Sequence, residues 1–214
     1  MQLIDTPSPN FDARALPVSM VVLHYTGMVD AASAIDRLAD PEAKVSAHYV
    51  VAEDGQVIRM VAEEQRAWHA GRSWWRGVTD INSASIGIEI VNPGHEFGYR
   101  PFPEAQVDAV IELLGGIVQR HGITRGNVVG HSDVAPARKE DPGELFPWYR
   151  LARLRLALPR PNRNLMDPHW SDAGFLLALE RFGYDVTDGV AAIRAFQRRF
   201  RPEMIDGIID GECR

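Results

Sequence analysis

Cysteine is almost missing from this sequence, and the one that occurs, Cys213, lies beside the C-terminus. A single cysteine cannot form a disulfide within the chain, so the cysteine content gives no support for an oxidising compartment. Basic residues are outnumbered, with 23 Lys and Arg against 29 Asp and Glu, and they form no long run. A net charge of −6 without a basic tract argues against nucleic acid as a partner. The short cluster FQRRFR, residues 196–201, has helical spacing and is interpreted as a solvated helix face.

Long hydrophobic runs are also missing. The longest early apolar run, residues 20–23, is far too short to cross a bilayer. Residues 1–20 contain two aspartates and three prolines and have none of the apolar core that an export signal carries. We therefore expect no transmembrane segment and a cytoplasmic location. The alternative is a periplasmic protein whose signal or lipoprotein segment is absent from this chain.

The chain does contain alternating strand-like and helix-like segments. Short apolar runs predict strands at 19–27, at 85–92, at 127–130 and on both sides of Asp54-Gly55, a dipeptide typical of a hairpin. Apolar residues at helical spacing predict helices at 30–40, with Asp30 as N-cap, and at 103–122, with Gly122 as the residue after the helix. This alternation predicts an α/β fold in which helices flank a mixed central β-sheet.

The composition changes at LPRPNRNLMDPHW, residues 158–170, which is rich in proline and asparagine. Such a segment is typical of a linker. Two amphipathic helices are predicted after it, at 171–186 and 187–200. We therefore predict a first domain over residues 1–158, a linker over 159–169 and a small α-helical module over 170–214.

One stretch, GHSDVAPARKEDPGELFPW at residues 130–148, places His131, Lys139 and Asp141 between prolines and glycines. It can form neither a long helix nor a central strand. His24 and Glu89 end strand-like runs elsewhere, and strand ends converge at one edge of a sheet. Two histidines and a carboxylate form a common catalytic zinc set. Zinc would lower the pKa of its water to roughly 7, Glu89 would act as base, and Lys139 would stabilise an oxyanion.

The alternatives remain open at this point, because the chain has no HExxH or CxxC motif. A lone histidine is more often packed or exposed than a ligand. His48 and His69 either line a cleft or simply pack, and His95 and His121, each beside glycine, are interpreted as ordinary loop or helix-end residues. Glu89 is costly in a core unless it is paired or functional, but an edge-strand charge facing water explains its spacing almost as well.

HSDVAPARKEDPG resembles the signature loop of the zinc-dependent N-acetylmuramoyl-L-alanine amidases of the AmpD-like family, relatives of the peptidoglycan recognition proteins. The similarity continues through VVLHYTG, SAHYVVAEDGQV, RAWHAG and NSASIGIEIVN, and it covers most of residues 18–150. The resemblance implies one zinc ion per chain, bound by His24, His131 and Asp141, with Glu89 and Lys139 catalytic. Four further residues would line the groove for muramic acid and stem peptide, or would support the loops instead: Trp68, His69, Asn82 and Arg138.

The C-terminal segments AIRAFQRRF and IDGIIDG resemble the helical peptidoglycan-binding module attached to some of these amidases. The resemblance is incomplete, since the sequence stops at Arg214 where a further helix is expected. A helical appendage that packs on the amidase and binds nothing explains the segment equally well.

The predicted reaction is hydrolysis of the amide between N-acetylmuramic acid and L-alanine, in peptidoglycan or in muropeptides that include the 1,6-anhydro form. No obligate protein partner is implied. Two other functions remain: a recognition protein that binds peptidoglycan without cutting it, and a zinc peptidase that acts on the stem peptide. The complete set of His24, His131 and Asp141 argues against the first, since the non-catalytic relatives lose a ligand.

Overall fold

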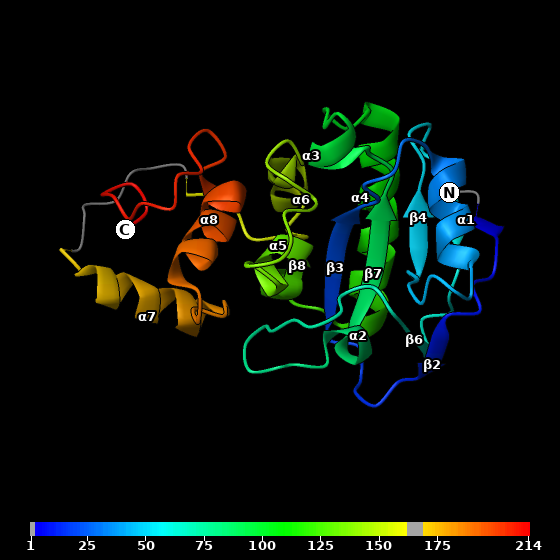
Figure 1. Ribbon diagram of the computed structural model, residues 1–214, viewed down its shortest axis with the longest axis horizontal. Helices are drawn as coiled ribbons and strands as arrows, with labels where there is room; N and C mark the ends of the chain where they lie inside the picture. The colour runs from blue at the N-terminus through cyan, green and yellow to red at the C-terminus, as the bar shows by residue number, and fades with distance from the viewer. Residues whose placement is uncertain (1–2, 162–168) are drawn as a thin grey trace.

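The structure is a computed structural model that describes residues 3–161 and 169–214. Its centre is a six-stranded mixed sheet in the order β1-β5-β4-β7-β3-β8 (Figure 1). The neighbours β4, β7, β3 and β8 are parallel, and β5 runs antiparallel to β4. The strands of the sheet are β1 (Leu3–Asp5), β3 (Met20–Tyr25), β4 (Tyr49–Val51), β5 (Val57–Arg59), β7 (Ser85–Ile90) and β8 (Val128–Gly130). A separate antiparallel ribbon pairs β2 (Phe11–Ala13) with β6 (Gln65–Ala67).

One face of the sheet is a continuous apolar core. Ile86, Ile88 and Ile90 are fully buried there, because alternate residues of a strand point to the same face. They belong to the same hydrophobic cluster as Val110 and Leu114 of helix α4 (Glu104–His121), which lies behind the sheet in Figure 1. Helix α6 (Trp148–Arg153) adds to this cluster.

The opposite face is shared among several shorter elements. These are α1 (Ala31–Ala39), α2 (Ile81–Ala84), α5 (His131–Val134) and, beyond the β8 edge in Figure 1, α7 (Asp172–Phe182) and α8 (Gly189–Phe200). A short α3 (Gly94–Phe97) and a 3₁₀ turn (Arg125–Asn127) lie in the connections. The apolar cluster on this face contains Val22 and Val129 of the sheet and Phe175, Tyr184 and Ile193 of the C-terminal region. The C-terminal helices therefore share a core with the sheet.

The expected α/β fold with a mixed sheet is confirmed, and local signals mark several boundaries. Asp30 caps α1 by accepting a hydrogen bond from Ser33 N–H, and Gly122 ends α4 in the left-handed conformation with φ 63°. The hairpin at Asp54-Gly55 joins β4 to β5. The strands β1, β2 and β6 were not predicted, because their sequences LID, FDA and QRA each contain a charged residue and form no apolar run.

The interpretation of FQRRFR as a solvated face is wrong. Arg198, Arg199 and Arg201 are only 8%, 8% and 3% exposed, because folding brings carboxylates to them that helical spacing does not reveal. The predicted linker at 159–169 lies largely outside the described residues, and the division into a domain and a module stays a prediction. Across residues 3–161 and 169–214, no helix combines the length and apolarity needed to cross a membrane.

Candidate metal centre and active site

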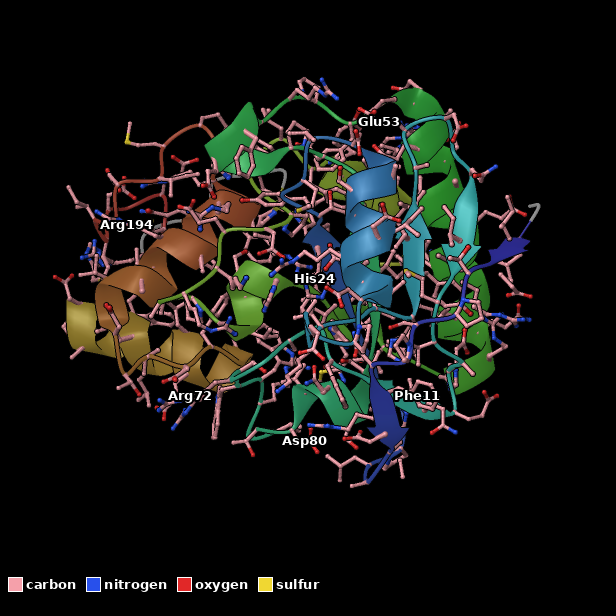
Figure 2. All side chains as sticks on the ribbon, turned by 45° about the vertical axis from the view of Figure 1, so that its right-hand side comes forward. Phe11, His24, Glu53, Arg72, Asp80 and Arg194 are labelled. Carbon is pink, nitrogen blue, oxygen red and sulfur yellow. The ribbon has the colours of Figure 1, made fainter. Side chains whose placement is uncertain are left out.

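Three predicted ligands meet at the ends of two adjacent parallel strands. His24 lies near the end of β3, and His131 directly follows β8, which pairs with β3. Asp141 reaches the same point from the loop after α5, and its carbonyl oxygen accepts a 2.9 Å hydrogen bond from Ser132 N–H. All three residues are buried, with 1%, 3% and 5% of their surface exposed for His24, His131 and Asp141. Figure 2 shows His24 in the interior of the molecule.

The three atoms that could bind a metal form a tight triangle. His24 Nδ1 lies 2.9 Å from His131 Nδ1, and each nitrogen lies 3.0 Å from Asp141 Oδ2. Hydrogen bonds cannot satisfy all three sides, because two ring nitrogens that both donate to the carboxylate would present two N–H groups to each other. A cation among them would satisfy all three at once. Tetrahedral zinc with 2.0–2.1 Å bonds separates its ligand atoms by ~3.3 Å, so the geometry and the donor types fit this metal.

Neighbouring groups determine which ring nitrogen of His24 is free. Ser85 Oγ–H donates to Ile81 O at 2.5 Å, so the same oxygen accepts from His69 Nε2–H at 3.2 Å. His69 Nδ1 then has a lone pair and accepts from His24 Nε2–H at 3.0 Å. Burial lowers the pKa of His24 to about 4 and holds the pKa of His69 well below its usual value, so both rings are neutral at pH 7. His24 therefore presents an unprotonated Nδ1 to the triangle.

The second histidine is fixed in the same way. His131 Nε2–H donates to the backbone oxygen of Ala70 at 3.0 Å, which leaves Nδ1 unprotonated. Asp141 Oδ2 lies 3.0 Å from this nitrogen, so a carboxylate oxygen and the imidazole lone pair face the same point. Two imidazole nitrogens and one carboxylate oxygen directed at one point form a donor set that suits a metal ion.

Glu89 lies directly beside His24, because the two are Cα partners across the parallel pair of β3 and β7. Partners in register point to the same face of a sheet, so both side chains leave the apolar face and enter the site. The Oε2 atom of Glu89 is buried and has no hydrogen-bond partner within residues 3–161 and 169–214. Burial, and then the charge of Asp141, raises the pKa of Glu89 well above its usual value, with Lys139 opposing the shift. An edge-strand charge facing water does not describe this carboxyl.

Gly87 leaves room for the ring of His69, which is hydrogen-bonded to His24. An added Cβ at Gly87 would lie 2.4 Å from Cγ of His69, so the imidazole packs directly on the β7 backbone. His48 also contacts Gly87. Its Nδ1 accepts from Gly87 N–H at 2.9 Å, and its Nε2–H donates to Gln65 O at 3.1 Å. Both histidines are thus held by protein groups: His69 lines the cavity, and His48 is fully buried with its ring centroid 5.7 Å from that of His69.

The triangle lies in the wall of a cavity of about 550 Å³. Glu89, Trp68, His69, Arg138 and Lys139 also line it. One hydrogen-bonding nitrogen of Arg138, Nη2, is occupied by Ala70 O at 2.7 Å and Arg72 O at 2.8 Å. The indole Nε1 of Trp68 is buried without a hydrogen-bond partner in the described part of the chain.

Asn82 does not line this cavity. Its Oδ1 accepts hydrogen bonds from the backbone N–H of His69 at 3.1 Å and of Ala70 at 2.7 Å. Because Ala70 O in turn accepts from His131, Asn82 holds the segment that orients a predicted ligand. Its geometry favours the loop-support alternative.

Several other residues that line the cavity were not predicted from the sequence. His95 lines the cavity, where its Nδ1 contacts Tyr25 Oη at 3.0 Å and its Nε2 contacts Glu144 at 3.1 Å. The hydrogen bond to Glu144 raises the pKa of His95 above its usual value. A position beside Gly94 did not distinguish it from an ordinary loop residue. The other unexpected lining residues include Met28, Arg37, Glu96 and Glu140.

Comparison with known proteins places this geometry in a family. The family model described as N-acetylmuramoyl-L-alanine amidase (Amidase_2) matches residues 14–144. The chain is 39% identical over 221 aligned residues to the N-acetylmuramoyl-L-alanine amidase AmiD of Escherichia coli, covering 91% of this chain and 79% of that protein. It is 34% identical over 163 residues to the 1,6-anhydro-N-acetylmuramyl-L-alanine amidase AmpD of Haemophilus influenzae, covering 67% and 86%.

Solved structures agree with the sequence comparison. The complex of E. coli AmiD with anhydro-N-acetylmuramic acid-L-Ala-D-γ-Glu-L-Lys matches with a TM-score of 0.83 at 35% identity, over 94% of this chain and 88% of that one. AmpDH3 of Pseudomonas aeruginosa in complex with anhydromuramic pentapeptide matches with a TM-score of 0.74 at 32% identity, over 92% and 88%. The family model ends before the C-terminal helices, whose resemblance to a wall-binding module stays a prediction. The chain belongs to the N-acetylmuramoyl-L-alanine amidase family.

Proposed function

We propose that this chain cleaves the amide between the lactyl group of N-acetylmuramic acid and L-alanine, with one zinc ion held by His24, His131 and Asp141. The observation that carries the proposal is the triangle of three lone-pair atoms, 2.9–3.0 Å apart, that hydrogen bonds cannot satisfy. Zinc in this position would acidify a water molecule and polarise the amide carbonyl. The protein's own groups must then move protons and orient the substrate.

Glu89 is the proton carrier in this proposal. Its raised pKa makes the carboxylate of Glu89 a stronger base than an ordinary glutamate, and a group of intermediate pKa both accepts and returns a proton readily. The buried, unpaired Oε2 leaves one oxygen ready to accept a proton from the attacking water. The same carboxylic acid then donates that proton to the departing amine of L-alanine. Glu89 thus both takes and returns the proton, so the proposed reaction needs no second general base.

Lys139 and Trp68 are proposed to act on the substrate directly. Both line the cavity, and the positive charge of Lys139 acts to lower the pKa of Glu89. An ammonium there would stabilise the oxyanion that develops on the attacked carbonyl. The unpaired indole N–H of Trp68 offers a donor to a sugar or peptide oxygen. Arg138 would contribute its remaining guanidinium N–H groups beside the loop that it holds.

His69 has a different role in this proposal from the one that the resemblance implies. Its two ring nitrogens are engaged by His24 and Ser85, so it orients a ligand through a hydrogen bond. Such outer partners fix both the tautomer and the direction of a metal-binding imidazole. Contact with substrate remains open to the edge of the ring that lines the cavity.

The 1,6-anhydromuropeptides are the proposed substrates, because both AmiD and AmpDH3 have been solved with anhydromuramic ligands. A direct test incubates the purified chain with 1,6-anhydromuramyl tripeptide and, separately, with intact sacculi, before and after removal of metal by a chelator. Mass spectrometry should find an intact peptide that begins with L-alanine, and readdition of zinc should restore its formation. Cleavage within the peptide, or full turnover after chelation, would overturn the proposal.

A further inference from the structure

The buried arginines of α8 reach the segment that carries His131. Asp133, two residues after His131, is only 1% exposed, and its carboxylate has three partners. Oδ2 accepts from the backbone N–H of Gly130 at 2.8 Å and from Arg199 Nη1 at 2.6 Å, and Oδ1 accepts from Tyr184 Oη–H at 2.6 Å. Two of the three partners therefore come from the C-terminal region.

These contacts hold the backbone on both sides of His131. Arg199 Nη2 donates to Val128 O in β8 at 3.0 Å, so one guanidinium binds the strand before His131 and the carboxylate after it. The same group lies 3.9 Å from the ring of Trp148, at the start of α6. A planar guanidinium that bridges two acceptors and stacks on an aromatic ring restrains orientation more than a lysine would.

The neighbouring arginine contacts the segment that carries the third ligand. Arg198 Nη2 donates to Glu140 Oε1 at 2.9 Å, and Glu140 directly precedes Asp141. Helix α8 thus contacts both segments that supply ligands after β8. The two segments are also tied to each other through Ser132 N–H and Asp141 O.

We infer that Arg199 and Tyr184 are positioning residues for the metal centre: they clamp Asp133 and thereby fix the backbone that presents His131 Nδ1. The inference rests on the proposed zinc site. A ligand backbone that can move costs metal affinity, because binding then has to order it. The C-terminal helices consequently act on zinc retention at a distance from the ion.

The experiment measures the zinc dissociation constant of the full-length chain by competition with a chromophoric chelator, alongside circular dichroism. The test variant is Arg199→Met, and Arg199→Lys is the conservative variant. The control is Arg201→Met, which removes an equally buried arginine whose partners, Asp206 and Asp210, lie within the C-terminal region itself. The electronic spectrum of the Co²⁺-loaded proteins reports on ligand geometry in each case.

We expect Arg199→Met to weaken zinc binding about 10-fold or more and to shift the cobalt bands, in line with the loss of other outer-shell partners. Arg199→Lys should recover part of the affinity, and Arg201→Met should bind zinc as the wild type does even if it unfolds at a lower temperature. Native affinity and spectrum in folded Arg199→Met would overturn the inference.

If Arg199→Met does not fold, Tyr184→Phe decides, since it removes one hydrogen bond to Asp133 and keeps the ring. Weaker zinc binding in that variant supports the clamp, and unchanged binding rejects it. A wild-type chain that binds no zinc would instead refute the proposed metal site, so the two failures are distinguishable.

Discussion

The two faces of β3 and β7 contrast strongly although they are built from alternate residues of the same strands. The face toward α4 carries Ile86, Ile88 and Ile90, each fully buried among apolar neighbours. The other carries His24 and Glu89 at the cavity, with Gly87 left bare for a histidine ring. The apolar face stabilises the sheet by removing hydrocarbon from water. The site face buries ionisable groups, which costs free energy, so the stability of one face supports the chemistry of the other.

Glu89→Gln should have the largest effect on the site face. The amide keeps the size of the side chain but cannot take a proton, so turnover should fall about 10²–10⁴-fold while zinc content stays at one per chain. Muropeptide turnover and elemental analysis of the same sample provide the measurement. A variant that cleaves at the native rate would remove Glu89 from the role of base.

Ile88→Ala should give the opposite result on the apolar face. Truncating a fully buried isoleucine costs about 2–5 kcal/mol of unfolding free energy, since it leaves a cavity beneath α4. Zinc affinity, and turnover per folded molecule, should remain near wild type. Urea denaturation gives the stability change, and a loss of zinc affinity in the folded fraction would show that the two faces are not separable.

Gly87→Ala tests how closely the site face is packed. The new methyl group would collide with the ring of His69, so we expect displacement of this ring and about 10-fold weaker zinc binding. Gly115→Ala in α4 is the matched control, because an added Cβ there meets no atom within 4 Å and should favour the helix. Equal zinc affinities for the two variants would contradict the proposed packing role.

Ser85→Ala should have the smallest effect. It removes the oxygen that accepts from His69 Nε2–H, so His69 can rotate or change tautomer and His24 loses part of its orientation. We expect zinc binding to weaken by a factor of a few, within the range of a single neutral hydrogen bond. Chelator competition measures the change. Zinc affinity equal to that of wild type would show that the hydrogen bond between Ser85 and His69 does not help to orient His24.

The sequence predicted the fold where local signals were strong. The isoleucine alternation located β7, Asp30 and Gly122 marked helix ends, and Asp54-Gly55 identified the hairpin. These signals depend on neighbours along the chain. The gathering of His24, His131 and Asp141 was expected from strand ends and from the family resemblance, and the structure brings these residues together.

Other features depend on contacts between distant segments and could not be read from the chain. The need for glycine at position 87 becomes clear only in the structure, where the ring of His69 packs against its backbone. The resemblance left Asn82 either as a groove residue or as a support of the loops, and the sequence could not show that its oxygen accepts from two backbone N–H groups. Arg198 and Arg199 have the spacing of an exposed helix face, but their partners come from 58 and 66 residues earlier.

The buried pairing of Arg199 with Asp133 bears on how this enzyme could be re-engineered. A chimaera that exchanges residues 170–214 for a foreign domain would remove Arg199 and leave an uncompensated anion two residues from His131. Successful grafts should therefore retain α8 together with Tyr184, and add new modules after Arg214.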